Sequence, residues 1–137
     1  MQQIVIKDGA TTPADHTFTP YTPQMGSLKS VTPAVWYERS GTSPLGWRRI
    51  TMSVEVNVSG ISKVRIVISD PVLAAIDNNC CVDAHTPVVS YTDFANIVFS
   101  LPFKATESNR KYILAFAENL LGNSVVTDAI VNLLPPV

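Results

Sequence analysis

The sequence predicts an α+β fold, with an antiparallel sheet in roughly the first two thirds of the chain and two helices after it. In residues 49–58 and 63–69 apolar and polar residues alternate with a period of two, which is typical of strands with one buried face. From residue 105 the apolar residues recur at a helical spacing of about 3.6. Strands followed by helices, without βαβ alternation, favour an antiparallel sheet with helices on one side.

The strands are predicted in chain order. Residues 1–20 predict an N-terminal hairpin that turns at Asp8-Gly9, and residues 21–33, rich in Pro, Ser and Thr, predict a connection. Residues 31–102 then predict the sheet, with strands at "AVWYERS", "WRRITMSVEVNV", "KVRIVISDP" and "VVSYTDFANIVFSLP" and a turn at "GTSPLG". Residues 71–87 predict a long loop, whose first part, "PVLAAID", is compatible with a helical turn.

Residues 105–134 predict two helices. In the first, Ile113, Phe116 and Leu120 form an apolar stripe, with Thr106 or Ser108 as N-cap and Gly122 at the end. The second stripe runs from Val126 through Ile130 to Leu133 and Leu134 and stops at the prolines that follow. With 137 residues the chain is expected to form a single domain, residues 1–137.

The composition limits the classes of partner. Charged residues make up 15% of the chain, against about 25% in ordinary soluble proteins, which favours burial of part of the surface in an oligomer. The net charge of −1 means that a nucleic-acid site must be a local patch. No apolar run reaches the roughly 20 residues of a membrane span, and the start "MQQIVIKDG" lacks the charged region and long apolar stretch of a secretion signal. We therefore expect no membrane partner and synthesis in a cytosol.

The two alternating strands around residue 60 predict one polar face. If they pair as a hairpin, five polar side chains share its exposed side, and these are Arg49, Thr51, Ser53, Lys63 and Arg65. In most proteins such a face is simply solvated surface. The alternative is a basic patch for phosphates.

The two cysteines of the chain, Cys80 and Cys81, are adjacent in "DNNCCVDAH". A zinc site with Asp83 and His85 is disfavoured, because the usual spacing is C-x₂₋₄-C. A catalytic cysteine would need an assembled base and oxyanion site, which the sequence does not show. We therefore predict no enzyme activity, no metal and no cofactor, and we assign His16 no function. A strained disulfide between the two neighbours stays open.

Several stretches carry a family resemblance. "KDGATTPADHTFTP", "AVWYERSG", "RITMSVEV", "KVRIVISDP" and above all "ANIVFSLPFKATESNR" resemble the coat proteins of single-stranded RNA bacteriophages, the leviviruses, over nearly the whole chain. The resemblance implies an N-terminal hairpin, a five-stranded antiparallel sheet and two C-terminal helices, in an interlocked homodimer with a ten-stranded sheet. It also implies a structural capsid protein of the virion, made in the bacterial cytoplasm, whose dimers assemble into an icosahedral shell, usually T=3.

The resemblance also implies RNA partners, namely genomic single-stranded RNA and a hairpin that serves as packaging signal and translational operator. The family's contacts, transferred position by position, fall on Thr51, Ser53, Lys63, Arg65, Phe94 and Asn96, and Arg49 shares their face. Lys and Arg would neutralise phosphates, and the Phe94 ring would stack on a base. Glu55 and Val67 stand where some relatives have basic residues, and Phe94 replaces a tyrosine, which predicts a different hairpin.

In that family the long loop surrounds openings of the shell, and some members join neighbouring loops there by disulfides. The resemblance therefore implies inter-subunit disulfides at Cys80 and Cys81. The alternative function is a free dimeric RNA-binding regulator that forms no shell, which the same basic face would serve.

Overall fold

A computed structural model describes residues 1–74 and 87–136, which form two compact units, residues 1–100 and the residues from 101 onward. The strands of the first unit are β1 (Ile4–Lys7), β2 (Asp15–Thr22), β3 (Met25–Ser27), β4 (Ser30–Thr32), β5 (Ala34–Glu38), β6 (Arg48–Val56), β7 (Ser62–Leu73) and β8 (Val89–Leu101). The helices of the second unit are α1 (Glu107–Leu121) and α2 (Ser124–Val131). The predicted α+β order is confirmed.

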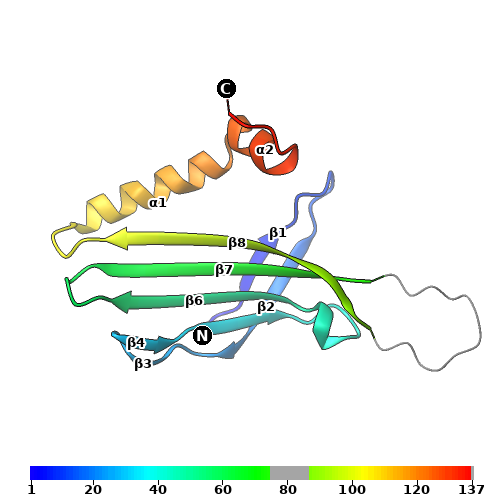
Figure 1. The fold of residues 1–137 in the computed structure, drawn as a ribbon, viewed down its shortest axis with the longest axis horizontal. Coiled ribbons are helices and arrows are strands. Elements are labelled where there is room, and N and C mark those ends of the chain that lie inside the picture. Colours follow the sequence, from blue (N-terminus) through cyan, green and yellow to red (C-terminus); the bar gives the residue numbers. More distant parts are fainter. Residues whose placement is uncertain (75–86, 137) are drawn as a thin grey trace, which may run out of the picture. The chain divides into compact units, whose positions relative to one another are not determined.

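Six of the strands form one curled antiparallel sheet in the order β1-β2-β5-β6-β7-β8 (Figure 1). Strand β2 pairs with β1 on one side and with β5 on the other, so the N-terminal hairpin is continuous with the sheet. The predicted hairpin of β6 and β7 is also present, with Ser53 opposite Arg65 and Thr51 opposite Val67.

Three local predictions need correction. The connection at 21–33 contains the small hairpin β3–β4, where a Cβ on Gly26 would lie 2.3 Å from the Ser30 carbonyl oxygen, so only glycine fits. The turn "GTSPLG" includes a 3₁₀-helix, η1 (Pro44–Gly46), capped by Ser43. Strand β7 continues through Pro71 to Leu73, so the start of "PVLAAID" is extended rather than helical.

The core of the first unit lies on one face of the sheet. Its buried members are Phe18, Ala34, Trp36 and Ile50, and Ile4 of β1 packs against them. The Trp36 indole donates a hydrogen bond of 2.9 Å to the Gln2 carbonyl, which fastens the N-terminal segment to the core. The N-terminal hairpin therefore supplies part of the cover of the apolar face.

A row of charged side chains joins four strands on the same face. Glu38 of β5, only 6% exposed, binds His16 Nδ1 at 2.5 Å and Arg48 Nη1 at 3.0 Å. Arg48 Nε donates to Asp70 on β7 at 2.8 Å, and His16 Nε2 lies 3.1 Å from Asp8 in the β1–β2 turn. The row ties the hairpin to β5, β6 and β7. Because both His16 nitrogens face carboxylates, the geometry favours the charged imidazolium.

The pKa values follow from these contacts. Hydrogen bonds to Glu38 and Asp8 raise the pKa of His16 above its usual 6.5. Burial pushes the pKa of Glu38 upward, but the hydrogen bonds from His16 and Arg48 outweigh it, so this pKa lies below its usual 4.5. The hydrogen bond from His16 also lowers the pKa of Asp8.

The helices of the second unit match the predicted stripes with one correction. The Thr106 hydroxyl accepts a hydrogen bond from the Asn109 backbone N–H, so Thr106 rather than Ser108 is the N-cap of α1, and Gly122 is the C-cap. Helix α2 ends at Val131, short of the predicted residue 134, because Leu133 adopts a positive φ of 54°. Neither of these described helices is long and apolar enough to cross a membrane.

The charge row predicts a pH optimum of stability. The contribution of His16 to the free energy of unfolding is fully present below pH 6.5 and is lost as the pH rises through its raised pKa. The contributions of Glu38 and Asp8 are present above pH 4.5 and 3.8 and are lost as the pH falls through their lowered pKa values. We therefore expect His16→Gln to lower the thermal unfolding midpoint more at about pH 5.5 than at about pH 9. An equal loss at both pH values would contradict the role of the imidazolium.

Candidate nucleic-acid interface

The pairing of β6 with β7 places the predicted polar side chains on one face of the sheet. Arg49 lies opposite Ser69, Ser53 opposite Arg65, and Glu55 opposite Lys63. Residues directly opposite in an antiparallel pair point to the same side. The side chains that alternate with them belong to the core side, and these include Ile50 and Met52 of β6 and Ile66 and Ile68 of β7. We call the first side the polar face.

Strand β8 adds an aromatic ring to the polar face. Thr92 and Phe94 line a hollow together with Arg49 and Ser69, so they lie on the same side of the sheet. Asn96 follows Phe94 by two residues and shares that side by alternation. Phe94 is 62% exposed, so its ring is accessible at the surface of the single chain.

Charge is distributed unevenly between the two sides of β5, β6 and β7. The polar face carries three cations, Arg49, Lys63 and Arg65, and the single anion Glu55. The core side carries two anions and one cation, which are Glu38, Asp70 and Arg48. The chain as a whole has a net charge of −1, but the polar face is locally basic, as a phosphate-binding surface must be.

The predicted site residues differ in accessibility. Arg49, Lys63, Arg65, Phe94 and Asn96 are exposed. Thr51 is half-buried, and Ser53 is only 5% exposed, with its hydroxyl 3.4 Å from a Glu55 carboxylate oxygen. The strand pattern predicted which side Ser53 faces but not its burial between longer neighbours. Thr51 and Ser53 are therefore recessed beneath the exposed cations.

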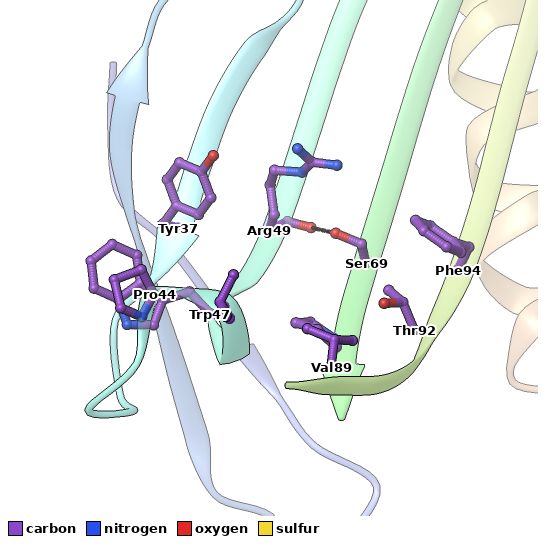
Figure 2. A pocket seen from close by; sticks show the side chains of 10 residues that line it. Tyr37, Pro44, Trp47, Arg49, Ser69, Val89, Thr92 and Phe94 are labelled. Atoms are coloured by element: carbon purple, nitrogen blue, oxygen red, sulfur yellow. Dashed lines mark hydrogen bonds between the residues drawn. The ribbon is translucent and has the colours of Figure 1, made fainter. Parts of the chain in front are cut away.

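A hollow of about 300 Å³ opens at one end of the polar face. Figure 2 shows Tyr37 and Trp47 on one side of it and Phe94 on the other, with Arg49 and Ser69 between them. Val89 and Thr92 of β8 also line this hollow. Figure 1 shows β8 curving at the same end.

Sequence reasoning missed Tyr37, Trp47 and Arg39. The Tyr37 and Trp47 rings lie 6.1 Å apart in an edge-on arrangement, and the Arg39 guanidinium lies 5.3 Å from the Trp47 ring centre. The signal for Tyr37 was available, because it alternates with the core residue Trp36 in "AVWYERS". Trp47 follows a 3₁₀-helix, where no strand period predicts its direction.

The remaining sequence predictions concern the cysteine pair and a metal site. Cys80 and Cys81 lie outside the described residues, as do Asp83 and His85. Within residues 1–74 and 87–136, no three His, Cys, Asp or Glu side chains are grouped so as to hold a metal ion. The polar face is thus the candidate site that the described structure supports.

Comparison with known proteins identifies the family. The family described as levivirus coat protein matches residues 1–136. The chain belongs to the levivirus coat protein family. Levivirus coat proteins are structural capsid proteins and not enzymes.

Relatives agree with this membership over nearly their full lengths. The capsid protein of Pseudomonas phage PRR1 is 30% identical over 97% of this chain and 95% of the relative. The structure of the virus-like particle of bacteriophage NT-214 has a TM-score of 0.88 at 46% identity, covering 98% of this chain and 97% of the other. That of bacteriophage ESE058 has a TM-score of 0.87 at 31% identity, covering 98% and 96%.

Glu55 is the one anion that β6 and β7 carry on the polar face, and it lies opposite Lys63. Replacing it by glutamine removes one repulsive charge beside Lys63, so we expect Glu55→Gln to tighten single-stranded RNA binding about two- to five-fold at low salt. Fluorescence anisotropy with a labelled oligonucleotide measures the change. The matched variant Asp93→Asn removes an anion that alternates with Thr92 and Phe94 and faces away, so it should leave the affinity unchanged. Equal effects of both variants would contradict a specific role of this face.

Proposed function

We propose that this coat protein, acting as one domain over residues 1–137, assembles an icosahedral shell and packages single-stranded RNA against the polar face of its sheet. The observation that carries the RNA assignment is the excess of cations on that face, where Arg49, Lys63 and Arg65 oppose only Glu55. Cations of this kind bind RNA by neutralising phosphates and releasing counterions. The solved relatives in virus-like particles support the shell.

The building block of this shell is proposed to be a homodimer. Strand β8 is the last strand of the sheet order, spans 13 residues and has β7 as its one neighbour in that order. A long unpaired edge readily pairs with another strand, and two copies related by a two-fold axis would join their sheets. The helices support the same conclusion, because Ile113, Phe116 and Leu120 are 45%, 68% and 60% exposed in the single chain.

Recognition of an operator hairpin is the finer part of the proposal. Phe94 and Asn96 on β8 and Arg65 on the neighbouring strand β7 offer a stacking surface, an amide for a base edge and a cation for a phosphate. Thr51 and Ser53 lie deeper, where an inserted base would have to reach them. We propose that the coat dimer binds such a hairpin in the bacterial cytoplasm before the shell closes.

Size-exclusion chromatography of the recombinant protein, read at 260 and 280 nm, tests the proposal. We expect elution near the void volume with a high ratio of absorbance at 260 to 280 nm, because an assembled shell would carry RNA. A void-volume peak without nucleic acid would contradict RNA packaging. A small dimer that binds RNA but never assembles would favour a free regulator instead.

Each basic residue should contribute to the salt dependence of RNA affinity in proportion to the number of phosphates that it neutralises. For single-stranded RNA each contact adds about −0.7 to the slope of log affinity against log salt, so Lys63→Ala with Arg65→Ala should flatten this slope by about 1.4. The matched control replaces Lys7 and Lys111, whose charges are paired with Asp15 and Glu107. A slope that falls equally in both double variants would remove Lys63 and Arg65 from the site.

We further propose that Cys80 and Cys81 link neighbouring subunits of the shell by disulfides that form after lysis releases the particles into oxidising surroundings. Cross-links of this kind constrain unfolding, so a reducing agent should lower the melting temperature of purified particles. Particles of the Cys80→Ser, Cys81→Ser variant are the control and should melt at the same temperature with or without reductant. An identical response of both particles would contradict the cross-link.

A further inference from the structure

The hollow at the end of the polar face has the composition of a nucleobase site. Its walls come from separate elements, with Tyr37 on β5, Trp47 just before β6 and Phe94 on β8. Arg49 on β6 and Ser69 on β7 lie between these rings (Figure 2). The residues that line it in the described part of the chain include no carboxylate. We call this hollow the aromatic pocket.

The aromatic rings on one side of the pocket are held in place before any ligand arrives. The Trp47 indole N–H donates a hydrogen bond of 3.1 Å to the Gly41 carbonyl. Tyr37 contacts Trp47 edge-on and also lies 5.3 Å from Tyr21 at an interplanar angle of 77°. Arg39 lies over both the Trp47 and the Tyr21 rings. A ring that is already fixed loses little conformational freedom when a ligand stacks on it.

The aromatic and guanidinium groups of the pocket indicate the class of ligand that it binds. Exposed aromatic rings stack on unpaired bases, and neighbouring guanidinium groups bind the phosphates that connect those bases. Arg49 inside the pocket and Arg39 beside it supply two such groups. The hydroxyl of Thr92 can bond polar atoms of a base or a ribose, whereas the buried Ser69 hydroxyl donates to the Arg49 carbonyl oxygen. The pocket is also continuous with the polar face through Arg49 and Phe94.

We propose that the aromatic pocket binds one unpaired nucleotide of single-stranded RNA, with its base stacked on Trp47 and its phosphate on Arg49. This inference rests on the proposed function of the polar face and adds a second contact at the end away from Lys63 and Arg65. Because every base has a flat ring face, the pocket accepts RNA with little sequence preference. It therefore serves packaged genomic RNA rather than one particular hairpin.

The two tryptophans of the chain allow a direct test. Trp36 is buried in the core at 8% exposure, whereas Trp47 lines the pocket. Full-length protein freed of packaged RNA is titrated with an oligouridylate of about ten nucleotides, and tryptophan fluorescence and anisotropy of the labelled RNA are read together. We expect binding with quenching in the native protein, and binding without quenching in Trp47→Phe, where only Trp36 remains.

Affinity provides the second readout. Loss of one stacked base lowers affinity about 5- to 150-fold, so we expect that loss for Trp47→Ala and a smaller one for Trp47→Phe, which keeps a ring. The control is Tyr91→Ala, because Tyr91 is an exposed aromatic of β8 that is not among the residues lining the pocket. Should Trp47→Ala fail to fold, the fluorescence of Trp47→Phe still decides the question.

The outcomes separate the two proposals. RNA binding without quenching in the native protein, or quenching that persists in Trp47→Phe, would overturn the aromatic pocket and leave RNA binding by the polar face intact. Absence of RNA binding in the native protein would overturn both. Binding with quenching that depends on Trp47 would establish the pocket.

Discussion

The register between β6 and β7 is the constraint on which the sheet and its proposed function depend. It sets Ile50 beside Ile68 on the core side and Ser53 beside Arg65 on the other. A slip of one residue would send the apolar set into solvent and the basic set into the core. Burial of the apolar side chains therefore holds the cations of the polar face in place, so that the core and the proposed RNA surface are two consequences of a single pairing.

The charge row reinforces this register from the core side. Glu38, Arg48 and Asp70 lie on three adjacent strands and contact one another in sequence across the sheet. Glu38 is nearly buried, so a shifted strand would leave its carboxylate without partners, which costs more than the exposed ion pairs contribute. His16 extends the row to β2 and the hairpin. The row thereby fixes β2, β5, β6 and β7 relative to one another.

Prediction from sequence succeeded for the strands that are long enough to show a regular alternation. It failed where a side chain's burial or direction depends on its immediate neighbours. The alternation in β6 and β7 predicted which residues share the polar face, because that requires only the direction of each side chain. It did not predict the burial of Ser53, which depends on the length of its neighbours, nor Trp47, whose direction is set by η1. The hairpin β3–β4 was missed because its three-residue strands are too short to show a period. The loop with Cys80 and Cys81 lies outside the described residues.

The central claim is that one face of the sheet meets RNA while the other forms the core. Ultraviolet cross-linking of RNA inside purified particles, followed by mass spectrometry of the attached peptides, tests it most directly. We expect cross-links on Phe94, Trp47 and the peptides that carry Lys63 and Arg65. Cross-links confined to the hairpin around Lys7, or to the helix around Lys111, would contradict it.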